Sequence, residues 1–140
     1  MTESFHVWIT VRGYELDTQG HLNNAVYHQY GEHARWEYVR AAGISVDTLR
    51  AAGIGPIILE STIRFRRELR SGDKVAVSCL FLWNEGKTFR AVQEFHTEDN
   101  DLVAELTSVC GLIDLQSRRL LADPGHHWRS IATTPQLLGL

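Results

Sequence analysis

The chain has 140 residues, the size of a single globular domain of roughly 100–150 residues. Hydrophobic residues make up 44%, charged residues 22%, and the net charge is −3, so the basic excess typical of nucleic-acid binders is absent from the composition. No apolar run approaches the roughly 20 residues of a membrane span, and the first residues do not resemble a signal peptide. We therefore expect a soluble cytoplasmic protein whose partners include neither nucleic acid nor membrane.

The first expected elements are a strand over residues 5–11 and a long helix. Small and aromatic residues recur at steps of three and four, which places them on one face of a helix. These residues are Tyr27, Tyr30, Gly31, Ala34, Tyr38, Ala41 and Ala42. Asn23 or Asn24 is expected to cap the start of this helix, and Gly43 is expected to end it. A second, short helix is expected over residues 46–52.

The middle of the chain is expected to form strands. Residues 57–65 alternate between apolar and polar side chains with a period of two, as a half-buried strand does. Further strands are expected over residues 75–83, 89–96 and 102–115. Tight turns rich in Gly, Asn and Asp separate them, so these strands must pair antiparallel, since parallel pairs need long crossovers. The predicted fold class is therefore α+β, with one strand, one long helix and an antiparallel meander.

These elements are expected to build one domain over residues 1–140, with a core of about residues 5–120 and a C-terminal tail at 123–140. The tail is expected to hold one short helix near residues 125–132 and otherwise to be mobile, and His126 and His127 are placed in it. Cys79 and Cys110 are expected to be free, buried thiols. The histidines of the long helix lack the spacing of metal ligands, so no metal and no cofactor is expected.

The strand at residues 75–83 is apolar on both of its alternating faces. Val77, Cys79 and Phe81 lie on one face, and Leu80 and Leu82 lie on the other. An antiparallel sheet with one face in water should alternate between apolar and polar residues. Because one helix covers only one face, the other is expected to meet a second subunit, which predicts a homo-oligomer, either a dimer or a tetramer.

The densest group of polar residues lies where the first strand gives way to the long helix. A helix N-terminus presents unpaired N–H groups and partial positive charge, so it can polarise a carbonyl and hold an oxyanion. Asp17 adds a carboxylate, Gly20 a bend that admits close approach, and Asn24 a helix-start N–H. Because Asp and Asn also cap helices without any catalytic role, the spacing alone leaves both interpretations open.

A longer motif runs through this segment. It is Asp17-x-x-Gly20-His21-x-Asn23-Asn24-x-x-Tyr27. This motif resembles the active site of hot-dog-fold thioesterases of the 4-hydroxybenzoyl-CoA thioesterase type, in which an antiparallel sheet wraps around one long central helix. The resemblance covers roughly residues 5–120 and implies an acyl-CoA thioesterase, which turns an acyl-CoA and water into a carboxylic acid and free CoA.

The resemblance also implies a role for each matching residue. Asp17 is the nucleophile or general base, and the backbone N–H of Asn24 polarises the thioester carbonyl. The substrate is expected to pass close to Gly20 and Asn23. Tyr27 and its neighbour His28 are expected to line the acyl or thiol side.

The plant acyl-carrier-protein thioesterases show a related pattern. Its residues here are Asp17, His21, Asn23-Asn24 and the segment Phe65-Arg66-Arg67-Glu68. The resemblance implies that His21 and Glu68 assist catalysis, although a structural histidine and a solvent-facing glutamate fit equally. Gln19 stands where those enzymes have an asparagine, so that role is not carried over. Those enzymes also have an extra half-length repeat, which a dimer would supply here.

The arginines of this segment have two possible roles. Arg66 and Arg67 would suit the phosphates of CoA, or they pair with acids at a strand end. An acyl carrier protein in place of CoA, a hydratase and a non-catalytic acyl-thioester-binding protein are the alternative functions, since fold alone does not fix function. The position of Asp17 at a helix start favours attack on a carbonyl.

Overall fold

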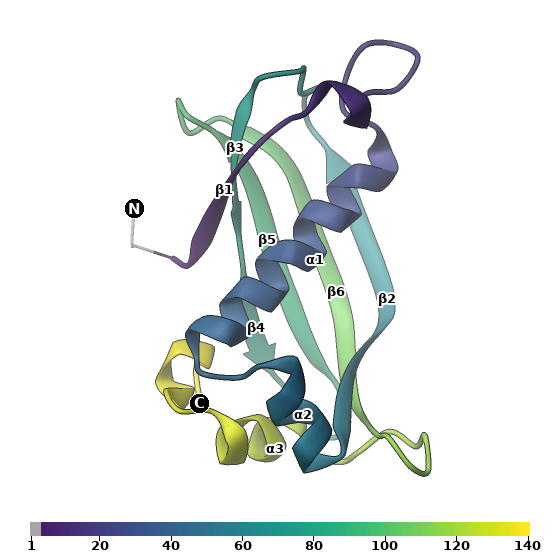
Figure 1. Ribbon diagram of the computed structural model, residues 1–140, viewed down its shortest axis with the longest axis vertical. Coiled ribbons are helices and arrows are strands. Elements are labelled where there is room, and N and C mark those ends of the chain that lie inside the picture. Colours follow the sequence, from purple (N-terminus) through teal and green to yellow (C-terminus); the bar gives the residue numbers. More distant parts are fainter. Residues whose placement is uncertain (1–3) are drawn as a thin grey trace.

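The computed structural model describes residues 4–140, which form one antiparallel sheet with helices on one side (Figure 1). The strands are β1 (His6–Thr10), β2 (Ile54–Phe65), β3 (Lys74–Ser78), β4 (Leu80–Trp83), β5 (Phe89–Thr97) and β6 (Leu102–Asp114). The helices are α1 (Asn24–Ala41), α2 (Val46–Ala52) and α3 (Pro124–Ile131), with 3-10 turns at Gly13–Glu15 and Pro135–Leu138. The predicted α+β class with one long helix is confirmed.

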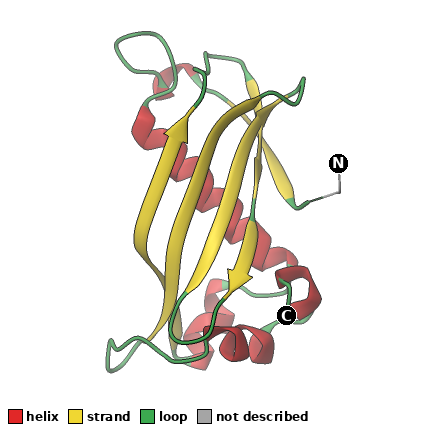
Figure 2. Ribbon diagram, turned by 180° about the vertical axis from the view of Figure 1, so that it is seen from behind, coloured by secondary structure: helices red, strands yellow, loops and turns green. Residues whose placement is uncertain are grey.

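The sheet has the strand order β1-β3-β5-β6-β2, and β4 pairs with β5 beside β3. Helix α1 runs diagonally across one face, while α2, α3 and the C-terminus gather at one end (Figure 1). From behind, the strands form a curved face that no helix of residues 4–140 crosses (Figure 2). Strands β1 and β2 lie at the two ends of this order, and within residues 4–140 β2 pairs only with β6, as β4 pairs only with β5.

The sequence of α1 explains where it begins and which face it buries. Asn23 is the cap, and its side chain accepts a hydrogen bond from the N–H of Ala25 at 2.9 Å. Most of the predicted apolar face is buried, including Tyr27, Tyr30, Gly31, Ala34 and Tyr38, but Ala41 near its end is exposed. Within residues 4–140, no helix is long and apolar enough to cross a membrane.

Two strands differ from the prediction. The expected strand at residues 75–83 is divided at Cys79, whose N–H donates to the carbonyl of Phe5 at 3.1 Å. Strand β2 begins three residues earlier than expected, and a bulge between Ile58 and Glu60 shifts its register against β6. Because of the bulge, the residues that face the helix change from even positions before it to odd positions after it.

The end of the chain packs on the core and is not a mobile tail. Helix α3 buries Trp128, and Leu138 follows it as a fully buried residue. The indole N–H of Trp83 donates to the carbonyl of Leu138 at 2.7 Å. His126 and His127 therefore lie on an ordered helix. The two cysteines are free and buried as predicted, and burial raises the pKa of both thiols.

Candidate active site

A tight turn presents Asp17 just before the start of α1. The N–H of Asp17 donates to the carbonyl of His21 at 2.8 Å, and the N–H of Gly20 donates to the carbonyl of Asp17 at 3.1 Å. Gly20 has a φ of 82°, in the left-handed region that glycine adopts most readily. Leu22 then anchors the chain, since its N–H donates to the carbonyl of Leu69 at 2.7 Å. The predicted bend at Gly20 thus has a conformational basis.

The carboxylate of Asp17 is oriented by its own loop. Its Oδ1 accepts the N–H of Gln19 at 2.8 Å and the N–H of His21 at 3.4 Å. Its Oδ2 lies 3.2 Å from Nδ1 of His21, and the side chain remains 28% exposed. A substrate can therefore approach a carboxylate that is already held in place.

His21 lies between two carboxylates. Its Nδ1 faces Asp17, and its Nε2 lies 3.7 Å from Oε2 of Glu68. Glu68 is itself held by Arg70, whose Nη2 donates to Oε1 at 2.7 Å. That hydrogen bond lowers the pKa of Glu68, so its carboxylate is ionised near neutral pH. His21 thus lies within hydrogen-bond distance of Asp17, whereas its separation from Glu68 is that of an ion pair.

The start of α1 leaves one backbone donor open. The side-chain oxygen of Asn23 accepts a hydrogen bond from the N–H of Ala25, and its backbone carbonyl accepts one from the N–H of Val26 at 2.9 Å. The N–H of Asn24 has no hydrogen-bond partner among residues 4–140. Since the helix dipole adds partial positive charge here, this N–H can receive a carbonyl oxygen.

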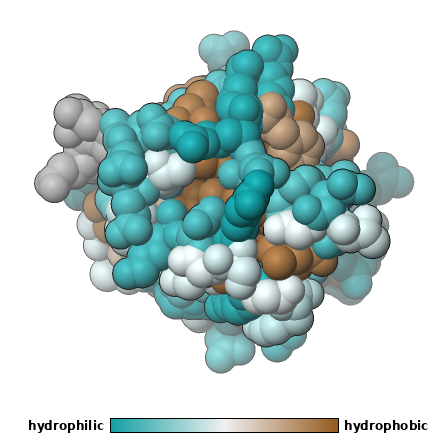
Figure 3. All heavy atoms as spheres, turned by 90° about the horizontal axis from the view of Figure 1, so that it is seen from above, coloured by the Kyte–Doolittle hydropathy of each residue, from teal (hydrophilic) through white to brown (hydrophobic). Residues whose placement is uncertain are grey.

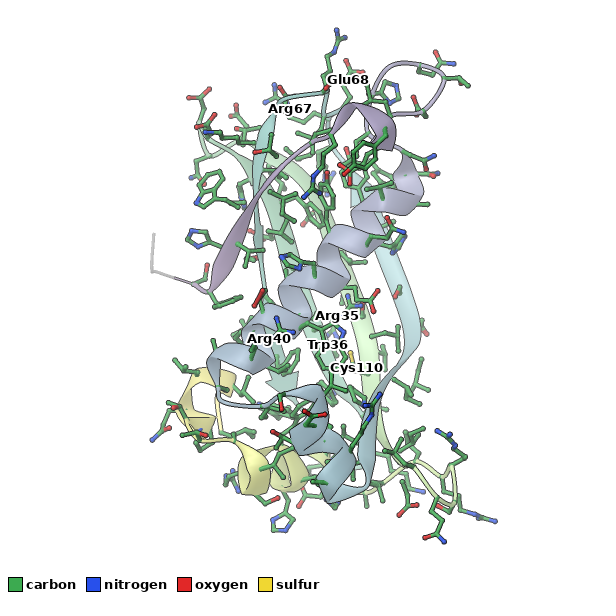
Figure 4. The ribbon with its side chains drawn as sticks, in the orientation of Figure 1. Arg35, Trp36, Arg40, Arg67, Glu68 and Cys110 are labelled. Atoms are coloured by element: carbon green, nitrogen blue, oxygen red, sulfur yellow. The ribbon has the colours of Figure 1, made fainter. Side chains whose placement is uncertain are left out.

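These groups meet in an open groove of about 520 Å³. It is lined by Asp17, His21, Leu22, Asn23, Asn24, Tyr27, Phe65, Arg66, Arg67 and Glu68. Arg67 and Glu68 lie at the end of the molecule where α1 begins (Figure 4). Seen from that end, the surface is mainly hydrophilic, with apolar residues visible between the polar ones (Figure 3).

Tyr27 forms the wall of the groove on the helix side. Its ring is buried, and its edge packs against Phe65 with ring centroids 5.1 Å apart. Burial, together with the carboxylates of Glu68 and Asp17, raises the pKa of Tyr27 to about 12. The hydroxyl therefore keeps its proton near neutral pH and can act as a donor.

The structure gathers eight of the ten predicted site residues in this groove and leaves out Gly20 and His28. Gly20 serves the turn, and His28 is exposed on α1. Arg66 and Arg67 line the groove, but each also pairs with an acid of another strand or turn. Nε and Nη2 of Arg66 both donate to Glu105, and Nη1 of Arg67 donates to Asp101 at 2.9 Å.

Three residues that shape the site were not predicted from the sequence: two apolar residues that line the groove, and one acid that connects the loop to α1. Leu22 and Phe65 line the groove, and Phe65 stood in the aromatic-Arg-Arg-Glu segment without being assigned a role. Glu15 ties the loop to the helix, since its carboxylate accepts the hydroxyl of Tyr30 at 2.5 Å. No sequence pattern joins these two residues, which are fifteen positions apart. Within residues 4–140, no three His, Cys, Asp or Glu side chains are grouped to hold a metal ion.

Comparison with known proteins settles the family. A family model described as the thioesterase-like superfamily matches residues 11–134. The chain belongs to the thioesterase-like superfamily. The predicted resemblance and the hot-dog fold are thereby confirmed, and a thioester hydrolase is the enzyme class of this family.

Individual proteins similar to this chain are also described as thioesterases. The chain is 32% identical to the long-chain acyl-CoA thioesterase FadM of Escherichia coli over 84% of this chain and 89% of that one. It is 44% identical to the chloroplastic acyl-acyl carrier protein thioesterase ATL3 of Arabidopsis thaliana over 55% of this chain, but it spans only 40% of ATL3. The structure of YbaW, a probable thioesterase of Escherichia coli, superposes with a TM-score of 0.83 at 27% identity, covering 96% of this chain and 98% of that one.

Proposed function

We propose that this member of the thioesterase-like superfamily hydrolyses acyl-CoA thioesters to free carboxylic acids and CoA. The observation that carries the proposal is the meeting of the Asp17 carboxylate and the open Asn24 N–H in one groove. FadM, which aligns along most of both chains, supports CoA as the carrier of the acyl group. A cytoplasmic location is part of the same proposal.

The geometry suggests how the reaction proceeds. The thioester carbonyl oxygen accepts the Asn24 N–H at the positive end of α1, which stabilises the charge that develops on this oxygen. Asp17 then attacks the carbonyl carbon to form an acyl-carboxyl anhydride that water opens, or it removes a proton from a water that attacks directly. In both routes the carbon–sulfur bond breaks, CoA leaves as a thiolate that takes up a proton, and the acid is released. Nδ1 of His21, 3.2 Å from Oδ2 of Asp17, orients this carboxylate for either route.

The test is to replace Asp17 with Asn and to measure release of free thiol from acyl-CoAs of several chain lengths. We expect kcat to fall by about 10²–10⁴-fold, the usual contribution of a general base. Asp47→Asn is the matched control, because Asp47 is an exposed acid in the first turn of α2. If the unmodified protein releases no thiol, the proposed function is wrong. If Asp17→Asn turns over at the original rate, only the role of Asp17 is wrong.

An acyl carrier protein is the second candidate carrier of the acyl group. It is favoured by the 44% identity to ATL3 over 77 residues, although that alignment covers less than half of ATL3. Parallel assays with decanoyl-CoA and decanoyl-acyl carrier protein separate the two candidates. A kcat/KM at least tenfold higher for the carrier-protein thioester would favour the second.

We also propose that the active protein is a homodimer formed through β2. This edge strand has 12 residues, and it exposes the apolar side chains of Ile58, Leu59 and Phe65. A long apolar edge with unpaired backbone groups is a template for pairing with another strand. A second β2, running antiparallel, would extend the sheet and cover these side chains.

A further inference from the structure

A second cavity lies further along the line between α1 and β2. The two elements run in opposite directions, so Tyr27 meets Phe65 near the active-site groove, while Arg35 and Trp36 meet Ile58 at the other end. The cavity holds about 110 Å³. An engineered cavity of about 150 Å³ binds benzene, so this one takes the last few atoms of a chain or a small group. Most of its wall is apolar, including Phe89 and Trp128.

Arg35 brings a positive charge to this apolar wall. Its Nη1 donates to Oε1 of Gln93 at 3.1 Å, and the fully buried Gln93 is fixed by donating to the carbonyl of Gly31 at 2.9 Å. Within residues 4–140, the Arg35 guanidinium makes no other hydrogen bond and no ion pair. Figure 4 shows Arg35 and Trp36 beside Cys110, near the middle of α1. A guanidinium has five N–H donors, so most of its donors are available to a ligand.

Glu32 lines the same cavity from the preceding turn of α1. It forms no ion pair with Arg35 within the described part of the chain. The cavity is therefore bordered by a cationic donor and an anionic acceptor that do not satisfy each other. A ligand carboxylate would be repelled by Glu32, and an amine by Arg35. A hydroxyl suits both, because it accepts from one and donates to the other.

The position of Arg35 along α1 sets where that hydroxyl must be. A Cβ built on Gly31 would lie 3.6 Å from Nη1 of Arg35, so the guanidinium lies beside Gly31. At about 1.5 Å per residue, this level lies roughly 10 Å beyond the Asn24 N–H along the helix axis. An extended chain advances about 1.25 Å per bond, as the 3.8 Å spacing of α-carbons over three bonds indicates. About eight bonds of the acyl chain therefore separate the thioester carbonyl at the Asn24 N–H from the hydroxyl at Arg35.

We propose that an acyl chain whose carbonyl is held at the Asn24 N–H runs along α1 into this cavity. The cavity then recognises a hydroxyl group at about the eighth to tenth carbon of the chain, with Arg35 donating to it and Glu32 accepting from it. The preferred substrates are then medium-chain hydroxyacyl thioesters. This inference rests on the proposed thioesterase function, because the chain must start at the Asn24 N–H for the length to hold.

The test compares 10-hydroxydecanoyl-CoA with decanoyl-CoA by kcat/KM. A hydrogen bond to a charged group is worth about 10–100-fold, so we expect at least a tenfold preference for the hydroxyacyl substrate. Arg35→Met keeps the length of the side chain and removes its charge and donors. It should make the two kcat/KM values equal, and the ratio of these two values is the readout. Arg40→Met is the control, since Arg40 lies on the same helix outside the cavity lining and pairs with Glu37.

A second variant and a binding measurement complete the test. Glu32 is exposed, so Glu32→Ala should fold normally and should lower the preference several-fold. Equal kcat/KM for both substrates in the unmodified protein, or an equal loss on both in Arg35→Met, would overturn the inference. If no acyl-CoA is hydrolysed, the proposed function fails separately. Tryptophan fluorescence, to which Trp36 and Trp128 of the cavity wall contribute, then still reports binding of 10-hydroxydecanoate and decanoate. Equal affinities for the two acids in the unmodified protein would refute the role of Arg35.

Discussion

Glu15 connects the loop that carries Asp17 to the body of α1. Its carbonyl accepts the N–H of Asn23 at 3.0 Å, and its carboxylate accepts the N–H of Arg12 at 2.9 Å as well as the hydroxyl of Tyr30. Burial alone raises the pKa of Glu15, but the hydrogen bonds from Tyr30 and Arg12 outweigh it and hold the pKa below its ordinary value. The ionised form of Glu15 therefore stabilises the folded protein and the loop together.

Replacing Glu15 with Gln removes this ionised form. Because the pKa is lower in the folded state, the stabilisation is complete above the ordinary carboxyl pKa of about 4.3 and is lost as pH falls through the folded value. We expect Glu15→Gln to lower the free energy of unfolding by about 1.5–3 kcal/mol at pH 7. The difference should shrink below about pH 4. Urea unfolding at pH 7, 5 and 3.5 measures this, with the exposed turn residue Glu98→Gln as control; a difference that stays constant to pH 3.5 would contradict it.

At the scale of elements, the approach of α1 to the sheet depends on one glycine. A Cβ on Gly31 would lie 2.5 Å from Cδ2 of Leu106 and 3.3 Å from Oε1 of Gln93. A side chain at this position would force Leu106 or the helix to shift. The same closeness lets Gln93 reach the carbonyl of Gly31 and so position Arg35 at the second cavity.

Gly31→Ala should therefore destabilise the protein, although alanine forms helices better by about 1 kcal/mol. Overpacking a tight interface typically costs about 1–3 kcal/mol, so we expect a net loss in the free energy of unfolding. In the Leu106→Ala background the added methyl group has space, and the cost of Gly31→Ala should become smaller. Thermal unfolding of the four proteins of this cycle measures the coupling. An equal cost in both backgrounds would show that the contact with Leu106 is not the cause.

Elements with a regular pattern and local caps were predictable from the sequence, and elements shaped by distant contacts were not. The period of α1 and its asparagine cap follow from neighbouring residues, so this helix was predicted within one residue of its ends. The bulge in β2 depends on pairing with β6, which is remote in sequence. The same holds for the sites: the Asp17 loop is one contiguous motif, whereas the cavity at Arg35 is assembled from α1, β2 and the C-terminal helix.

At the scale of the whole molecule, the free edge and the uncovered face of the sheet offer two different surfaces for assembly. Leu59 is 49% exposed on the edge strand β2, and Leu80 is 50% exposed on β4. The active-site groove and the second cavity both border β2, because each includes residues of this strand. Pairing through β2 would therefore place both sites beside the partner subunit, whereas β4 contributes a residue, Phe81, to the second cavity alone.

Placing a lysine on each surface in turn distinguishes the two modes of assembly. A lysine on an edge strand opposes pairing, because it would bury a charge without a partner. With a chain mass of 15.9 kDa, light scattering should give twice this value for the unmodified protein at micromolar concentration. Leu59→Lys should give the mass of one chain, and Leu80→Lys should remain a dimer. The reverse outcome would place the interface on the uncovered face. If the unmodified protein has the mass of four chains and each of the two variants has the mass of two, the protein is a tetramer that uses both surfaces.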